Sequence, residues 1–231
     1  MWVDEVEVPG TTDDRLAIWN WNVEEKRPTD ALFKRPMLQG PIDDGFKSRF
    51  ILVLPDGLPD GTASDKWARI EADHFLVRWR SLMRGDAMVR TAKEVTEKDI
   101  QDCHLVVWGT PNTNTLMRKI LASPSLIDVI TWDDQVVRIG EQQGPSASSV
   151  PVLCFPNPLN PSRYVIVNSG LTFREVHDKT NSLQNPKLPD WAILDIAEPP
   201  SIESAGRVIA ADFFDSQWKV QPRVKLPENR E

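Results

Sequence analysis

The stretch FILVLPDG, residues 50–57, decides the fold class of this 231-residue chain. Its first five residues are all apolar, and they end at a Pro-Asp-Gly turn. A strand with one solvated face alternates apolar and polar residues, so an uninterrupted apolar run indicates a strand buried on both faces. Such burial requires helices on each side of a sheet, and it predicts an α/β domain.

Further strands follow from the same reasoning. Apolar runs predict central strands at residues 105–108, 152–155 and 164–167, and two final strands at 191–196 and 208–211. Residues 127–132 and 135–139 flank Asp133-Asp134 and predict a hairpin. The proline-rich stretch 156–161 is expected to end the strand that precedes it.

Helices are expected between these strands. Apolar residues recur at helical spacing from Ala68 to Met83, and Gly85 stands where a helix cap belongs. Thr96 predicts a short capped helix. Two more helices are expected over residues 115–122 and from Leu171 to about residue 183. This alternation predicts a three-layer α/β domain with a largely parallel sheet of the Rossmann or flavodoxin type.

The two ends of the chain differ in character from this domain. Residues 1–37 are expected to form a strand-bearing arm or the tail of a preceding β module, because LAIWNWNV at 16–23 alternates with period two. Its tryptophans are expected to pack against the main domain rather than to bind a sugar or a partner. The α/β domain is assigned to residues 38–220, and the polar tail 221–231 is expected to fray. No signal peptide pattern is present at the start.

Composition excludes several classes of function. Asp plus Glu number 34 and Lys plus Arg number 27, which gives a net charge of −7 and disfavours nucleic acid as a partner. No apolar run approaches the roughly 18 residues of a membrane-spanning helix. Cys103 and Cys154 adjoin or lie within buried strands, so both are expected to remain free thiols.

Two polar loops are the candidate ligand-binding region. The candidate residues are Gly109, Thr110, Asn112, Thr113 and Asn114 in the first loop, and Asn168, Ser169 and Thr172 in the second. Each loop is expected to join a parallel strand to a helix, so both would lie at one sheet edge and present backbone N–H groups to an anion in a shared crevice. In the alternative reading, Thr113 or Asn114 caps one helix and Ser169 or Thr172 the other, which leaves nothing for a ligand.

The sequence carries no catalytic or metal-binding motif. GxSxG, HExxH, Walker A and GxGxxG patterns do not occur, and no Cys/His cluster has zinc spacing. We therefore predict no catalytic residue, no metal ligand and no cofactor. His74, His104 and His177 are expected to be ordinary solvated or partly buried side chains. The carboxylate pairs 43–44, 133–134 and 212/215 are expected to form turns and solvated surface rather than to perform acid–base chemistry.

Several strings nevertheless resemble one family. LQGPIDDGF at 38–46 is similar to an LQGPIDDAF element of large prolyl-oligopeptidase-like proteins found chiefly in planctomycetes. Residues 105–114 resemble an LVLWGDPxSN loop of the same region, with Thr110 and Thr113 replacing its Asp and Ser. The strings at 151–161, 164–175 (YVIVNSGLTFRE), 187–192 and 210–215 complete the series in the same order, so the resemblance covers roughly residues 38–218.

The resemblance implies an accessory role. In that family this region follows an α/β-hydrolase catalytic domain, which carries the nucleophilic serine, so no catalytic residue transfers to this chain. The implied function is a non-catalytic accessory domain that positions or recognises substrate for a secreted or periplasmic serine hydrolase, with that catalytic domain as partner. The alternative is an independent small-molecule or anion-binding α/β module that uses loops 109–114 and 168–172. A third possibility is a hydrolase in its own right.

Overall fold

The computed structural model describes residues 2–3, 6–7, 32–172, 174–176 and 188–221. The chain divides into two compact units, Met1–Ala31 and Leu32–Glu231. In the first unit, β1 (Trp2–Val3) pairs antiparallel with β2 (Val6–Glu7). The strand expected at 16–23 and the frayed tail expected after 221 lie outside the described residues. Everything below concerns the second unit.

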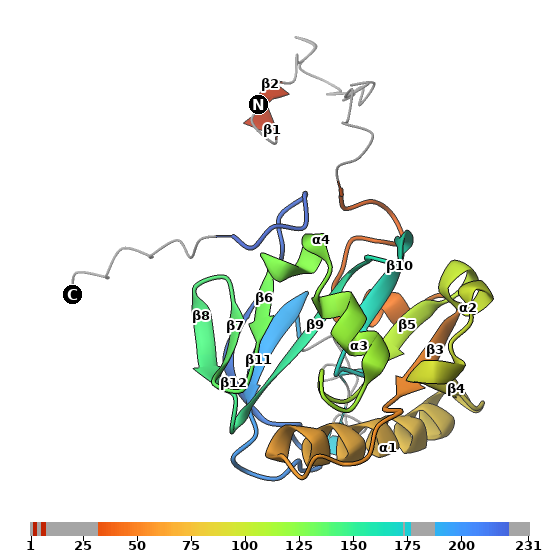
Figure 1. The fold of residues 1–231 in the computed structure, drawn as a ribbon. Helices are drawn as coiled ribbons and strands as arrows, with labels where there is room; N and C mark the ends of the chain where they lie inside the picture. The colour runs from red at the N-terminus through yellow and green to blue at the C-terminus, as the bar shows by residue number, and fades with distance from the viewer. Residues whose placement is uncertain (1, 4–5, 8–31, 173, 177–187, 222–231) are drawn as a thin grey trace. The chain divides into compact units, whose positions relative to one another are not determined.

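The second unit alternates strands with helices from residue 50 to residue 127, and a succession of strands follows from residue 130 to residue 212 (Figure 1). Its elements are η1 (Ile42–Phe46), β3 (Phe50–Leu54), α1 (Ala63–Met83), β4 (Met88–Thr91), η2 (Ala92–Glu94), α2 (Glu97–Asp102), β5 (His104–Val107), α3 (Thr115–Leu121), α4 (Pro124–Ile127), β6 (Ile130–Trp132), β7 (Val136–Ile139), β8 (Gln142–Pro145), β9 (Ser149–Asn157), β10 (Asn160–Val167), β11 (Trp191–Asp195) and β12 (Arg207–Asp212). The strands predicted from apolar runs are all confirmed, and so is the hairpin of β6 and β7.

The fold is α/β, with a seven-stranded mixed sheet in the order β12-β11-β9-β10-β5-β3-β4. Strands β10, β5, β3 and β4 are parallel to one another, whereas the pairings β10–β9, β9–β11 and β11–β12 are antiparallel. A second sheet, β6-β7-β8, is small and antiparallel. The expectation of a largely parallel sheet therefore holds for one half of the main sheet only.

The antiparallel half arises where the prolines were expected to end a strand. Instead, β9 runs through Pro156 to Asn157 and turns directly into β10. The side chain of Asn157 accepts a hydrogen bond from the backbone N–H of Leu159 at 3.0 Å, which builds the tight turn from within the chain. A side-chain turn of this kind reverses the chain in two residues, so β9 and β10 become neighbours in a hairpin rather than separate parallel strands.

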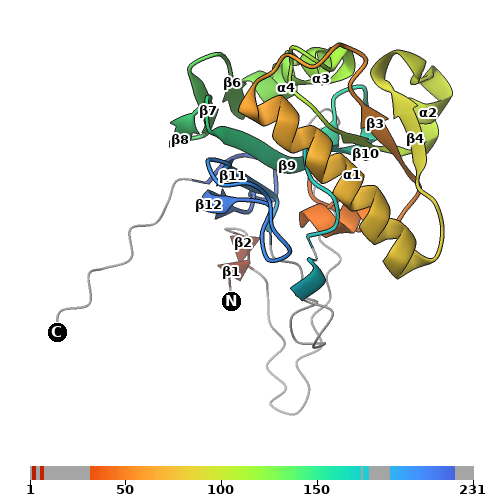
Figure 2. The ribbon, with the colours of Figure 1, turned by 90° about the horizontal axis from the view of Figure 1, so that it is seen from below.

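Helices lie on both faces of the sheet. Figure 2 shows α1 crossing one face, while α3 and α4 lie on the other. The aromatic rings of Phe46, Phe50, Phe75 and Trp79 pack together, with Phe50 and Trp79 edge to face at 4.7 Å between centroids. These rings attach α1 and η1 to the sheet beside β3. The central residues of β3 and β5 and the last four residues of β10, 164–167, are buried, as their uninterrupted apolar runs predict.

Side-chain caps set the helix boundaries. Thr62 caps the start of α1, and Thr96 forms a capping box with Asp99 at the start of α2, as predicted. At the end of α1, the left-handed residue is Arg84 with φ 60°, not Gly85 as expected. Gly85 stands one position too late to take that conformation, because the helix ends at Met83 and the next residue carries the cap.

The helix expected from Leu171 does not begin there. Leu171 and Thr172 are not helical, and a short turn follows only at Glu175. Instead, Asp43 accepts hydrogen bonds from the N–H of Thr172 at 3.2 Å and from its hydroxyl at 2.9 Å. This contact from a distant segment holds the chain in a non-helical course. The rest of the expected helix, including His177, lies outside the described residues.

Cys103 and Cys154 are both buried free thiols, which confirms the prediction. Burial raises the pKa of both thiols. Within the described ranges, no helix has the length and apolar character needed to cross a membrane. The same residues contain no cluster of three His, Cys, Asp or Glu side chains arranged for a metal ion.

Candidate functional site

The two candidate loops lie at the same edge of the sheet, as predicted, because β5 and β10 are parallel neighbours. Asn168 joins the two loops directly. Its side-chain oxygen accepts a hydrogen bond from the N–H of Gly109 at 2.9 Å, and its amide group donates to the Gly109 carbonyl at 3.0 Å. Asn168 is buried and adopts a left-handed φ of 51°, a conformation that Asn tolerates better than most residues. The amide of Asn168 is therefore used within the protein.

Protein groups already bind several backbone donors of the first loop and of the helix that follows it. Asn114 caps α3 by accepting from the N–H of Met117 at 2.9 Å, so the capping alternative is correct for this helix. Asp56 accepts from the N–H of Thr115 at 3.0 Å and from its hydroxyl at 2.7 Å. Burial alone would raise the pKa of Asp56, but these hydrogen bonds outweigh it and lower the pKa. An internal carboxylate thus occupies the position in which an external anion would bind this helix terminus.

The side chains of the two loops line different cavities rather than one shared crevice. Thr110 and Asn112 line a hollow of about 410 Å³ together with Asp60, Asp133 and Asp134. The second loop lines another cavity, of about 260 Å³, through Asn168, Ser169 and Thr172. Gly109, Thr113 and Asn114 line neither cavity and serve the internal bonding of the loop.

The cavity of about 260 Å³, called the α1 cavity here, lies between α1 and one face of the sheet. Val152, Leu194 and Val208 form an apolar floor across β9, β11 and β12. Trp67 on α1 and Trp108 after β5 contribute apolar walls, and their ring centroids lie 6.3 Å apart. Val208 is 49% exposed, so the cavity opens to solvent beside β12.

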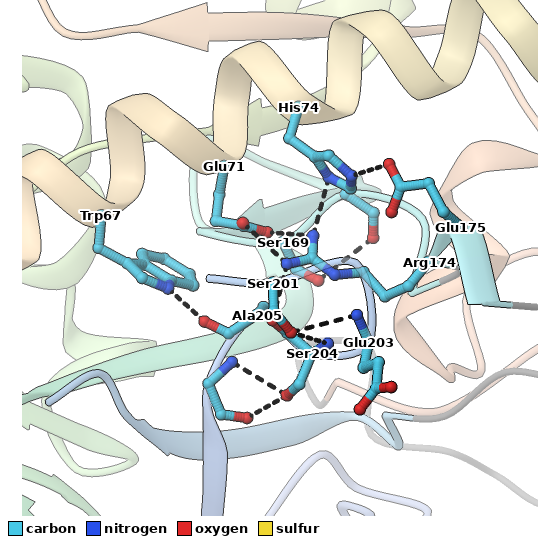
Figure 3. Close-up of polar contacts among 12 residues, drawn as sticks. Trp67, Glu71, His74, Ser169, Arg174, Glu175, Ser201, Glu203, Ser204 and Ala205 are labelled. Atoms are coloured by element: carbon cyan, nitrogen blue, oxygen red, sulfur yellow. Dashed lines mark hydrogen bonds and ion pairs between the residues drawn. The ribbon is translucent and has the colours of Figure 1, made fainter. Parts of the chain in front are cut away.

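A buried ion pair forms the polar wall of the α1 cavity. Figure 3 shows Arg174 directed at Glu71 and His74 on α1. Its two terminal nitrogens, Nη1 and Nη2, donate to the two carboxylate oxygens of Glu71 at 2.9 and 3.1 Å. Nη2 also donates to the carbonyl of Ser204 at 2.9 Å. Both side chains are buried, and a bidentate geometry of this kind compensates the charges that burial would otherwise leave unsolvated.

His74 extends this network toward solvent. Its Nδ1 lies 2.8 Å from Arg174 Nη1, and its Nε2 lies 2.8 Å from the Glu175 carboxylate. Because a guanidinium can only donate, Nδ1 must accept, and in the neutral ring the proton therefore sits on Nε2 and is donated to Glu175. Burial opposes ionisation of Glu175, but hydrogen bonds from its backbone and from His74 lower its pKa overall. The imidazole is thus held between two fixed partners.

Ser169 is placed for structure rather than for nucleophilic attack. Its hydroxyl donates to the carbonyl of Gly170 at 3.2 Å. Within the described residues, no hydrogen bond connects Ser169 to a histidine. His104 lies elsewhere, at the other end of β5, where its Nδ1 accepts from the N–H of Tyr164 at 2.8 Å. The pattern of a serine hydroxyl activated by an adjacent base is therefore not formed by these residues.

Asp43 and Asp44, expected as turn formers on solvated surface, are buried instead. Asp43 anchors Thr172, and Asp44 accepts a hydrogen bond from the Tyr164 hydroxyl at 2.8 Å. Burial raises the pKa of Asp43, against the lowering effect of its bonds to Thr172. Asp43 thereby positions Thr172, which lines the α1 cavity. Asp133 does act as a turn former, accepting from the N–H groups of Gln135 and Val136.

Sequence reasoning missed the polar wall of the α1 cavity. Glu71 stands on the apolar stripe of α1, between Ala68 and Ala72. A charged residue on such a stripe indicates a buried partner of opposite sign. Nothing in the spacing identifies that partner as Arg174, which is 103 residues away.

The comparisons with known proteins give no match: no family model, no curated protein and no solved structure matches this chain. The resemblance of its strings to an accessory region of prolyl-oligopeptidase-like proteins therefore stays an expectation drawn from the sequence.

Proposed function

We propose that this chain supplies a non-catalytic, ligand-binding accessory domain to a serine hydrolase. The observation that carries the binding part is the α1 cavity of about 260 Å³, enclosed by α1, the sheet and the loop that follows β10. In open α/β sheets, ligands bind preferentially beyond the carboxyl ends of the strands, and loop 168–172 stands at that edge.

Binding is favoured over catalysis because the reactive groups near the cavity are already engaged with one another. Glu71 is paired with Arg174, His74 lies between Arg174 and Glu175, and Ser169 donates to its neighbouring carbonyl. A general base must have a free lone pair within reach of the proton that it takes. Here both ring nitrogens of His74 have protein partners.

The accessory role rests on the ordered strings between residues 38 and 218. The first string contacts another one in the structure, since Asp43 and Asp44 anchor Thr172 and Tyr164. A domain of this kind would position or recognise substrate for an α/β-hydrolase catalytic partner. The proposal includes the finer fold assignment, a three-layer domain of Rossmann or flavodoxin type, which the parallel half of the sheet with helices on both faces supports.

The alternative is an independent small-molecule-binding module that uses the same cavity. Anion binding at the first loop is the weaker form of that alternative, because Asp56 already accepts the donors of Thr115 at the start of α3. The gene context separates the two readings. An adjoining or continuous reading frame that encodes a GxSxG hydrolase supports the accessory role, and an isolated gene favours the independent module.

A fragment screen by ligand-observed NMR tests the binding function. Val208 lines the α1 cavity and is half exposed, so Val208→Trp can place an indole in the cavity without a buried clash. Fragments that bind the cavity should lose affinity in this variant and keep it in Val77→Trp, a matched control on the exposed side of α1. A fluorophosphonate probe should leave the protein unlabelled. Serine labelling, or a screen without any binder sensitive to Val208→Trp, would overturn the proposal.

A further inference from the structure

We infer that the α1 cavity selects neutral ligands with an apolar body about the size of an aromatic ring. This inference rests on the proposed binding function and adds the chemical class of the ligand. It follows from the size of the cavity, from the composition of its floor, and from the way its charged and polar groups are paired.

The size and floor of the cavity fit a single substituted ring. A dry apolar cavity of roughly 150 Å³ already holds benzene. The α1 cavity, at about 260 Å³, therefore has room for a ring with a short substituent. Its floor of Val152, Leu194 and Val208 and its two tryptophan walls contribute the apolar surface that such a ring would bury.

The charges in the polar wall cancel one another. The charged side chains that line the cavity, among the described residues, are Glu71, Arg174 and Glu203. Both carboxylate oxygens of Glu71 accept from Arg174, and both terminal nitrogens of Arg174 donate to Glu71. A ligand carboxylate would have to displace Glu71 from Arg174, and a ligand ammonium would have to displace Arg174 from Glu71. Either exchange breaks a buried bidentate pair and gains no more than it loses.

Glu203 does not alter this balance. Glu203 is an exposed residue of the cavity lining, and its carboxylate is directed away from the Arg174 guanidinium (Figure 3). A solvated charge at that position interacts weakly with a ligand inside, because water and salt screen it.

The neutral polar groups leave hydrogen-bonding opportunities, among them the buried indole N–H of Trp108, which has no partner among the described residues. The indole N–H of Trp67 donates to the carbonyl of Ala205 at 2.6 Å, and the Asn168 amide is used on Gly109. The hydroxyl of Ser204 accepts from the N–H of Gly206 and donates to its carbonyl. Ser169 donates to Gly170, but its oxygen keeps lone pairs that can accept. A ligand hydroxyl can therefore donate to Ser169 or accept from Trp108, so a neutral polar group finds a partner without breaking the Glu71–Arg174 pair.

Three probes of one shape and different charge test the inference at pH 7: benzyl alcohol, benzoate and benzylammonium. Dissociation constants come from ligand-observed NMR on the full chain, with Val208→Trp and Val77→Trp as cavity and surface controls. Benzyl alcohol should bind at least tenfold tighter than both ions and lose at least tenfold in Val208→Trp only. N-acetyl-phenylalanine amide, added as a fourth probe, identifies the source of the ring: tighter binding than benzyl alcohol points to a polypeptide side chain, and weaker binding to a free small molecule.

A charge variant provides the second test. Glu71→Gln removes the carboxylate but keeps the shape, so the positive charge of Arg174 beside the cavity loses this compensation. The preference should then move toward benzoate by at least tenfold. Tighter binding of benzoate or benzylammonium to the unaltered protein would overturn the inference of a neutral ligand and leave the binding function standing. No binding by any of the four probes would overturn both. The unaltered protein decides these outcomes even if Glu71→Gln does not fold.

Discussion

The loops that follow β5 and β10 begin at the same edge of the sheet but are held by different partners. Each leaves the same sheet edge and carries small polar residues, and Asn168 bonds one to the other. In the first loop, Asn114 caps the helix that follows it, and Asp56, which is 59 residues earlier in the sequence, accepts from Thr115. The second depends on distant residues, because Asp43 holds Thr172 and Glu71 holds Arg174. Both loops border a hollow, but Asn114 of the first loop caps a helix, whereas no helix begins at Leu171 in the second.

The largest effect on stability is expected from breaking the Glu71–Arg174 ion pair, which holds the second loop. Glu71→Ala leaves the buried Arg174 guanidinium without its carboxylate, and we expect a loss of about 3–5 kcal/mol in the free energy of unfolding. Urea unfolding followed by circular dichroism measures it. The double variant Glu71→Met with Arg174→Met removes both charges and should recover most of the loss. A cost below about 1 kcal/mol for Glu71→Ala would contradict the dependence on this pair.

Acid titration tests a group away from both loops, His104 at the start of β5, as the source of the pH dependence of stability between pH 6.5 and 4. Burial lowers the pKa of His104 from 6.5 to about 4, with a smaller contribution from Arg163. Between these values the unfolded chain binds a proton that the folded protein does not. Stability should therefore fall as pH falls through this window, by up to about 3 kcal/mol.

The control for this titration is His104→Asn, whose side-chain oxygen can still accept from the Tyr164 N–H. Urea unfolding at a series of pH values should show a flatter profile between pH 6.5 and 4 for this variant. An unchanged slope would assign the acid sensitivity to another group.

The link between the loops is the next target. Asn168→Ala removes the partners of both the N–H and the carbonyl of Gly109 in a buried position, and it places Ala at a positive φ. We expect a loss of about 2–3 kcal/mol, measured by thermal unfolding. Asn168→Gly keeps the backbone conformation accessible and separates the two contributions. If both variants match the unaltered protein, the loops are held together by something else.

The smallest effects are expected at the two carboxylates that hold the loops, Asp56 and Asp43. The lowered pKa of Asp56 means that it stabilises the fold above its unfolded-state pKa, and that this contribution is lost as pH falls through the folded value. The raised pKa of Asp43 has the opposite sign, so stability falls as pH rises from its unfolded to its folded pKa.

At pH 7, Asp56→Asn keeps an acceptor for Thr115 but removes the negative charge favoured at a helix N-terminus, so it should cost about 0.3–1 kcal/mol. Asp43→Asn keeps an acceptor for Thr172 and removes a buried charge, so its stability should be unchanged or higher. Paired urea titrations of the two variants measure the contrast. A larger loss for Asp43→Asn than for Asp56→Asn would reverse the assignment of the signs.

Prediction from sequence succeeded where neighbouring residues decide the outcome. Apolar runs predicted the buried strands, and Thr96 and Asn114 were recognisable as caps because their partners lie three residues away. The helix expected from Leu171 was wrong at its start, because the competing partner, Asp43, stands far from Thr172 in the sequence. The antiparallel half of the sheet was missed for a local reason: the Asn157 side chain turns the chain where prolines indicated a stop.

By itself, the sequence determined the α/β class, the buried strands, the free cysteines and the shared edge of the two loops. These features follow from the pattern of apolar and polar residues over a few neighbouring positions, which the sequence shows directly. Tertiary structure alone decided that the loops line separate cavities and that the functional candidate is the α1 cavity. Its polar wall joins Glu71 and Arg174, which are 103 residues apart in the sequence. Coulomb attraction and burial select such pairs by distance in space, which spacing along a sequence does not record.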